Sequence, residues 1–260
     1  MSDASASTHI LVSRAGPVAT ITLDRPEKLN AITLAMLSAL DAALVTIDAD
    51  TETRVVVITG AGPKAFSAGA DVVAWSSLAP LDMWRSWTRL GHQVMERLES
   101  LRQPTIASLN GIAYGGGLEL ALACDLRLAA DHVTLRAPEV GIATVPGWGM
   151  TTRLATIAGP ARAKQMILTG MPIDAVRAEA WGIISEVVPA DDLEAATDRL
   201  ATGIAAQAPV AVQVAKQLID ANRPRPSLEG LGGGLTAYTD DAGEGQAAFR
   251  ERRPPDYGGS

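Results

Sequence analysis

The chain has 260 residues, of which 47% are hydrophobic and 20% are charged, and its formal net charge is -7 at pH 7. This balance fits one globular domain with a substantial core and argues against broad nucleic-acid binding. The single cysteine, Cys124, excludes an intramolecular disulfide and a cysteine-based metal cage, and the histidines His9, His92 and His132 form no spaced pair.

The first eight residues, 1–8, are small and polar and lack the basic start and apolar centre of a signal peptide, so we expect a disordered tail. No apolar run approaches the roughly 20 residues that span a bilayer. The sequence therefore predicts a soluble, cytoplasmic protein.

The first elements form a hairpin and a helix. Residues 9–14 and 17–23 are typical of short strands, and a helix is expected over 33–48 with Thr33 as its cap. Residues 54–59 form an apolar run that indicates a strand buried on both faces. The glycines at the start of 60–71 imitate a dinucleotide-binding fingerprint, but no amphipathic helix continues from them, so we interpret this stretch as a loop that something approaches closely.

The central part of the chain alternates strands and helices. A helix is predicted over 82–101, a buried strand over 104–109, and a second helix that follows the glycine triplet and ends near residue 123. Further predicted elements are strands over 125–129 and 133–136, a turn-rich segment over 137–150 and a short helix over 151–158.

The chain is mostly helical after residue 160. Helices are expected over 160–169, 174–181, 191–207 and 209–222, within 227–240 and within 241–251, with one short strand over 184–188. We divide the chain into the tail 1–8, a catalytic core over 9–200 and a helical region over 201–260, whose wide apolar faces fit packing on another subunit or within one chain.

Two glycine-rich loops each follow a predicted buried strand: residues 68–70 after strand 54–59, and residues 115–117 after strand 104–109. If the strands are neighbours, one backbone N–H from each loop can hold the same oxygen, which is the geometry of an oxyanion hole. The alternative is that both loops are ordinary tight turns.

Two acids, Glu119 and Glu139, lie among apolar or small residues. A buried carboxyl has a raised pKa and exchanges protons near neutrality, so this pair fits general acid–base catalysis. The alternatives are an acid in the first turn of a helix for Glu119 and a solvated loop residue for Glu139.

The segments 66–71, 110–125 and 138–147 resemble, in order and spacing, the motifs of the crotonase superfamily, and the resemblance is closest to enoyl-CoA hydratase. It covers the chain from about residue 10 to residue 253. The resemblance implies an α/β fold: a spiral of ββα units with two roughly perpendicular sheets, followed by C-terminal helices that form trimers, commonly stacked as hexamers.

The resemblance also implies a reaction of fatty-acid β-oxidation, the reversible hydration of a 2-enoyl-CoA to a 3-hydroxyacyl-CoA. The amides of Ala70 and Gly116 would hold the thioester oxygen. Glu119 would activate water for attack on the β-carbon, and Glu139 would supply or remove the α-proton. Beyond the substrate's own coenzyme A it implies no cofactor and no metal. The acidic balance and the lack of a long apolar run predict no nucleic-acid or membrane partner.

The resemblance also assigns further residues to substrate binding, because they match the superfamily's binding positions. Those matching coenzyme A contacts are Lys28, Ala31, Lys64, Ala68, Gly69, Asp71, Val72, Phe249 and Arg252. The last two match a pair that often reaches the substrate of a neighbouring subunit, and arginine stands where lysine is usual. Those expected at the acyl pocket are Trp84, Trp87, Tyr114, Gly147 and Trp148.

The departures from the hydratase pattern bear on the acyl group. Trp148 stands where a small residue is usual, and its indole would shorten the acyl pocket, stack on an unusual acyl group or pack outward. The alternative functions are another reaction of the superfamily, such as enoyl-CoA isomerisation or dehydration of a specialised hydroxyacyl-CoA, and a non-catalytic binding protein. The presence of both acids favours the hydratase.

Overall fold

The computed structural model describes residues 9–76, 78–221 and 226–260, and within them the strands form two sheets. The larger sheet has the order β1 (Ile10–Ala15), β2 (Val18–Leu23), β3 (Val55–Gly60), β5 (Thr105–Leu109), β7 (Leu126–Ala130) and β10 (Glu186–Val188). The smaller sheet has the order β4 (Ala65–Ser67), β6 (Ile112–Tyr114), β8 (Thr134–Arg136) and β9 (Ile173–Asp174).

Both sheets are mainly parallel. Among the strands that the structure describes, the β1–β2 hairpin in the larger sheet and the β8–β9 pair in the smaller one are antiparallel, and the other pairs are parallel. Strands β3 and β5 are buried along almost their whole length, as their continuous apolar sequence predicts.

The chain builds both sheets at once through a repeated strand–strand–helix unit. Each of the units β3–β4, β5–β6 and β7–β8 places its first strand in the larger sheet and its second in the smaller one. The sequence prediction placed the two glycine loops after strands 54–59 and 104–109 and expected them to meet if these strands are neighbours. The corresponding strands β3 and β5 are neighbours, and the short paired strands β4 and β6, which the prediction missed, lie between them and the loops.

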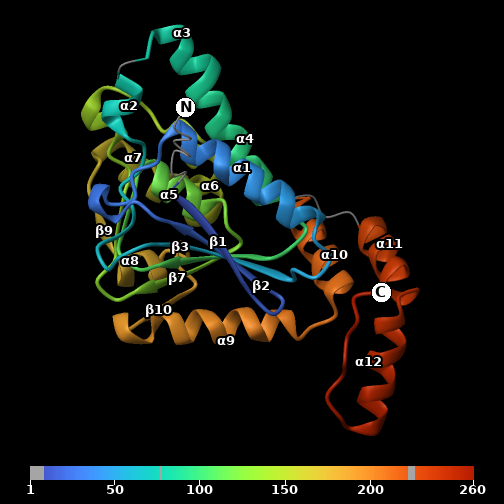
Figure 1. Cartoon of the computed structure of the whole chain (residues 1–260). Coiled ribbons are helices and arrows are strands. Elements are labelled where there is room, and N and C mark those ends of the chain that lie inside the picture. The colour runs from blue at the N-terminus through green and yellow to red at the C-terminus, as the bar shows by residue number, and fades with distance from the viewer. Residues whose placement is uncertain (1–8, 77, 222–225) are drawn as a thin grey trace, which may run out of the picture.

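Helices cover the larger sheet. Helix α9 (Leu193–Ala205) packs along one face, against β2, β3, β5 and β7, and runs beneath the sheet in Figure 1. Helices α1 (Leu34–Ala49) and α4 (Arg89–Ser100) pack against each other. As predicted, the Thr33 hydroxyl caps α1 by accepting a hydrogen bond from the Met36 amide.

The other helices are mostly short. They are α2 (Val72–Ser76), α3 (Pro80–Asp82), α5 (Gly116–Leu122), α6 (Met150–Ala158), α7 (Pro160–Thr169) and α8 (Ala175–Ala180), with 3-10 turns at Pro26–Lys28, Glu139–Ile142 and Ala190–Asp192. The helix predicted over 82–101 is not α-helical throughout, because Met83–Thr88 forms a π-helical segment before α4. Such segments are frequent at functional sites.

Of the last helices, α10 (Pro209–Asp220) lies against the body of the molecule, where Lys216 pairs with Asp125, whereas α11 (Pro226–Ala237) and α12 (Asp240–Glu251) extend away from the sheets in Figure 1. The predicted fold class, α/β with two sheets and C-terminal helices, is confirmed. The domain boundary at residue 200 stays a prediction, and the predicted tail, 1–8, lies outside the described residues. In the described part of the chain, no helix combines the length and the apolar character that crossing a bilayer requires.

Candidate active site

Helix α5 begins where two neighbouring segments of the smaller sheet end. Gly115 precedes it with a φ of 49°, and the Gly115 amide donates to the Arg136 carbonyl of β8. This backbone conformation is costly for a residue with a side chain. The turn places the Gly116 N–H and the first-turn side chain of Glu119 on the same buried side of the molecule.

The loop after β4 leaves one amide free. The Ala68 amide donates to Leu29 O, the Gly69 amide to the Ser67 hydroxyl, and the Asp71 amide to Ile32 O. Among the described residues, the Ala70 N–H between them donates to none, and neither does Gly116 N–H. A Cβ added to Gly69 would lie 3.1 Å from the Gly116 nitrogen, so the two loops touch.

A segment far away in the sequence holds this loop. The Arg25 guanidinium pairs with the Asp71 carboxylate at 2.6 Å and also donates to Ala31 O. Hydrogen bonding to Arg25 lowers the pKa of Asp71, so the pair is ionised at neutrality. Asn30 is fully buried and donates to the carbonyls of Ala61 and Ala65.

These holding residues were missed in the sequence analysis. Arg25 and Asn30 lie in a stretch that breaks the strand pattern, and Leu29 and Asn30 both have positive φ values, 53° and 54°. An asparagine in a non-periodic turn is the only local signal of such a role, because asparagine tolerates this backbone region better than most residues do.

Glu119 is buried and has two donors on one oxygen. Its Oε1 accepts from the Trp148 amide at 2.7 Å and from the Met150 amide at 3.1 Å. Burial raises the pKa of Glu119 to about 7, and the charge of Glu139 adds to this, while the two amides oppose it. The group therefore takes up and releases protons near neutrality.

Glu139 lies at the start of the 3-10 turn Glu139–Ile142 and is 9% exposed. Its Oε2 is buried and has no hydrogen-bond partner among the described residues. Burial raises the pKa of this carboxyl as well. A buried acid oxygen without a partner is rare in folded proteins and has room for a substrate or water contact.

Both acids line one cavity of about 380 Å³, together with Ala70 and Gly116. Its other walls come from the two loops, the π-helical segment and residues 138–148. The remaining lining residues are Ala68, Val72, Trp75, Met83, Trp87, Thr88, His92, Gly115, Pro138, Ile142, Thr144, Val145, Pro146, Gly147 and Trp148. The cavity thus combines two free amides and two acids of raised pKa within mainly apolar walls, as an acyl group would require.

Only some of the residues predicted to contact coenzyme A lie at the cavity in the described part of the chain. Ala68 and Val72 line the cavity, and Gly69 lies buried behind it. Asp71 is engaged by Arg25, and Ala31 accepts from the same arginine. Lys28 and Lys64 are exposed on the segments that flank the loop.

Phe249 and Arg252 are not brought to this cavity. Phe249 is 87% exposed on α12, Arg252 ends that helix, and Figure 1 shows α12 far from α5. The single chain therefore does not assemble the C-terminal part of the predicted coenzyme A site.

The predicted acyl-pocket residues divide in the same way. Trp87, Gly147 and Trp148 line the cavity. Trp84 is 68% exposed and lines a separate outer groove, and Tyr114 is absent from the cavity wall because its hydroxyl bonds Thr134 Oγ1 on β8 at 2.9 Å.

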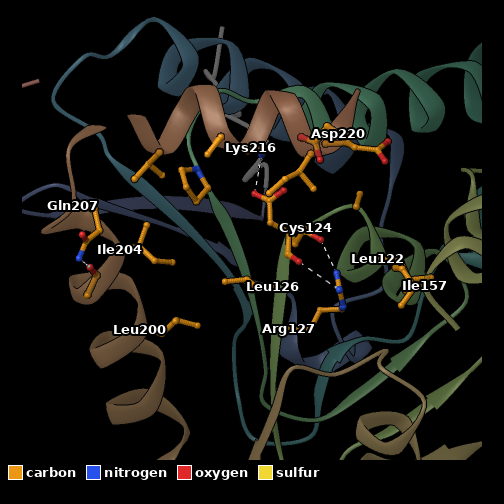
Figure 2. A pocket seen from close by; sticks show the side chains of 18 of the residues that line it. Leu122, Cys124, Leu126, Arg127, Ile157, Leu200, Ile204, Gln207, Lys216 and Asp220 are labelled. Carbon is orange, nitrogen blue, oxygen red and sulfur yellow. Dashed lines mark hydrogen bonds and ion pairs between the residues drawn. The ribbon is translucent and has the colours of Figure 1, made fainter. Parts of the chain in front are cut away.

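A second, larger cavity of about 750 Å³ lies at the other end of α5. Figure 2 shows its walls, from the end of α5, from β7, and from α9 and α10. There Lys216 pairs with Asp125 at 2.7 Å, and the buried Arg127 donates to backbone carbonyls, including that of Cys124. Burial raises the pKa of the Cys124 thiol to about 12, so it is not a nucleophile at neutrality.

Comparison with known proteins gives a consistent result. Residues 13–260 match the family model described as enoyl-CoA hydratase/isomerase. The chain is 36% identical over 250 residues to a short-chain-enoyl-CoA hydratase of Clostridium acetobutylicum, covering 94% of this chain and 95% of that protein.

Two further relatives are as informative. A carnitinyl-CoA dehydratase of Salmonella arizonae is 37% identical over 262 residues, covering 97% of this chain and 99% of that protein. The crystal structure of an enoyl-CoA hydratase from Bacillus anthracis superposes with a TM-score of 0.94 at 38% identity, covering 97% of this chain and all (100%) of that one.

Proposed function

The chain belongs to the enoyl-CoA hydratase/isomerase family, and from that premise we propose that it catalyses the reversible hydration of a 2-enoyl-CoA to a 3-hydroxyacyl-CoA. One observation carries the proposal: two acids of raised pKa, Glu119 and Glu139, share a cavity with two free amides. An isomerisation that moves one proton needs only one such acid, whereas hydration adds a hydroxyl and a proton at two carbons.

The amides of Ala70 and Gly116 would receive the thioester oxygen. As water attacks, negative charge develops on that oxygen, and N–H donors aimed at it stabilise the transition state by about 3–4 kcal/mol each. Because the Ala68, Gly69 and Asp71 amides already have partners, the Ala70 amide is free to make this bond without breaking another.

The acids would divide the proton transfers. Glu119 accepts a proton from water as the water oxygen bonds to the β-carbon, and the α-carbon takes a proton from Glu139. Glu119 Oε1 is held by two amides, which leaves Oε2 to face water. The unpartnered Oε2 of Glu139 fits a proton donor to the substrate. Acid–base assistance of this kind contributes about 10²–10⁴-fold to the rate.

We also propose that the protein works as a homotrimer or as a hexamer of two trimers. The projecting helices α11 and α12 and the turn between them expose large apolar side chains, among them Leu231, Tyr238 and Phe249. In such an assembly Phe249 and Arg252 would reach coenzyme A on a neighbouring subunit, and a guanidinium binds phosphate well. The cytoplasmic location, the part in β-oxidation and the absence of a cofactor beyond coenzyme A also belong to this proposal.

Turnover of crotonyl-CoA in water labelled with ¹⁸O tests the proposed reaction. The absorbance of the conjugated thioester should fall, and the product should gain the mass of one labelled water. A product of unchanged mass from a 3-enoyl-CoA would identify an isomerase instead. No reaction with short-chain, medium-chain or aryl enoyl-CoAs would rule the hydratase out.

A further inference from the structure

Trp148 lies at the buried end of the candidate active-site cavity. Among the lining side chains, Trp148 is 2% exposed and Trp87 is 4% exposed, whereas Val145 is 69% exposed. The cavity therefore has an exposed rim and an inner end formed by two tryptophans, whose ring centroids lie 5.7 Å apart. Of the alternatives that the sequence left open for Trp148, outward packing is thus excluded, because its indole packs inward.

The indole is fixed in this position by two glycines on different helices. A Cβ added to Gly91 of α4 would lie 1.9 Å from the indole nitrogen, and one added to Gly116 of α5 would lie 2.4 Å from its benzene edge. The ring therefore occupies space that any other residue at either position would need. Its backbone is held as well, because the Trp148 amide donates to Glu119 and its carbonyl accepts from Arg153.

This position lies next to the reacting atoms. Under the proposed function, the thioester oxygen sits at the Gly116 amide, and the indole edge packs against the same residue. An acyl chain that runs inward beyond the β-carbon meets the ring. The described walls of this cavity are mainly apolar and suit an apolar acyl chain; besides the two acids, the polar side chains among them are Thr88, His92 and Thr144.

We propose that Trp148 is a specificity-determining residue, which closes the inner end of the acyl cavity and restricts the protein to acyl groups of short chain length. This inference rests on the proposed function for the orientation of the thioester. It assigns to Trp148 a role in which the backbone amide positions Glu119 and the side chain limits the acyl group.

Binding of saturated acyl-CoA thioesters tests the inference. These compounds carry no double bond, so their affinity is measurable by calorimetry whether or not the protein hydrates enoyl-CoA. The wild-type protein should bind butyryl-CoA at least as tightly as octanoyl-CoA. Trp148→Ala keeps the amide that holds Glu119 and removes the ring. The ratio of the affinity for octanoyl-CoA to that for butyryl-CoA should therefore rise by about tenfold or more over the wild type, because several more methylenes become buried.

Two further variants make the result decisive. Trp148→Leu leaves a smaller gap, should shift the preference in the same direction, and serves if Trp148→Ala does not fold. Trp181→Ala removes a tryptophan that lies outside the cavity, against Arg162, and should keep the wild-type ratio.

A wild-type affinity that rises steadily from butyryl-CoA to lauroyl-CoA would overturn the inference, and so would an unchanged ratio in both Trp148 variants. Absence of enoyl-CoA turnover together with the predicted shift in binding would refute the hydratase and leave the role of Trp148 standing.

Discussion

The two ends of helix α5 each place buried ionisable side chains beside a cavity, but their chemistry differs. At the C-terminal end, Lys216 pairs with Asp125, which also accepts from the Thr105 amide and hydroxyl, and Arg127 bonds backbone carbonyls. At the N-terminal end, Glu139 has an oxygen without a partner among the described residues, and burial raises the pKa of Glu119 to about 7.

The difference shows why cavity size does not locate the site. The cavity at the C-terminal end is about twice as large, at ≈750 Å³ against ≈380 Å³, but Lys216 and Asp125 there form an ion pair and Arg127 is hydrogen-bonded to backbone carbonyls. Such a network fastens α10 to the sheet. Buried acids and amides without hydrogen-bond partners lower the stability of the fold unless a substrate or water bonds to them. Such destabilising groups are typical of catalytic sites.

The largest expected effect is on catalysis at the N-terminal end. Glu139→Gln removes the proton that the α-carbon takes and should lower kcat for hydration by about 10²–10⁴-fold. Affinity for a saturated acyl-CoA should change little, because the two amides remain. Steady-state kinetics and calorimetry measure both, with the exposed Glu186→Gln as the control. Wild-type kcat in Glu139→Gln would remove this acid from the mechanism.

The free energy of unfolding should depend on pH through the ionisation of Glu119. Its pKa rises from 4.5 in the unfolded chain to about 7 in the folded protein. Between these values the folded protein holds a proton that the unfolded chain has released, so stability falls as pH rises through this window and stays lower above it. The loss amounts to about 3 kcal/mol in the free energy of unfolding.

Glu119→Gln can accept both backbone hydrogen bonds and carries no charge, so it should lose most of this slope and be more stable than the wild type at alkaline pH. Urea unfolding at a series of pH values measures the difference. Parallel stability curves for the two proteins would show that Glu119 ionises normally.

Removal of a charge at the C-terminal end should act on stability instead. Asp125→Asn leaves the Lys216 ammonium, whose side chain is 7% exposed, without its carboxylate. The free energy of unfolding should fall by about 1–3 kcal/mol, less than for a fully buried pair because Asp125 is partly exposed. Asp48→Asn, at an exposed ion pair with Arg102, is the control and should have little effect. Equal unfolding free energies for the two variants would contradict a structural role for the network.

Glycine substitutions test the packing of the two cavities. Gly91→Ala would place a methyl group into the Trp148 indole and should cost about 1–3 kcal/mol of stability. Gly203→Ala lies on α9 at the other cavity, with no atom within 4 Å of the added carbon, and should stabilise the helix by up to about 1 kcal/mol. Thermal unfolding distinguishes these opposite signs, and a harmless Gly91→Ala would mean that the indole is free to move.

The smallest expected effect is at Cys124, beside the larger cavity. Because burial raises the pKa of its thiol to about 12, the native protein should react negligibly with a thiol reagent at neutral pH. The same thiol should react fully after denaturation. Rapid labelling of the native protein would show that this end of α5 opens to solvent.

Much of this arrangement is predictable from local sequence. The glycine triplet, the acid in the next helical turn and the buried strands before them depend on neighbours within a few residues, so the pattern identifies them. The strands β4 and β6 are missed because each has only three residues and lies between glycines, which indicate turns rather than strands.

Other parts depend on contacts that no local pattern contains. Arg25 and Asp71 are 46 residues apart, and their pairing follows from how β4 crosses to the smaller sheet. The inward position of Trp148 depends on Gly91, on a helix that precedes it by more than fifty positions. The sequence contains Gly91 and Gly116 but does not show that the indole of Trp148 packs against both.

The central claim is that the N-terminal end of α5 performs the chemistry and the C-terminal end supports it. The most direct measurement is turnover of crotonyl-CoA by the wild type, Glu119→Gln and Asp125→Asn, each normalised to its folded fraction. We expect equal rates for the wild type and Asp125→Asn, and a rate about 10²–10⁴-fold lower for Glu119→Gln. A Glu119→Gln variant as active as the wild type, or a folded Asp125→Asn variant as inactive as Glu119→Gln is expected to be, would contradict the account.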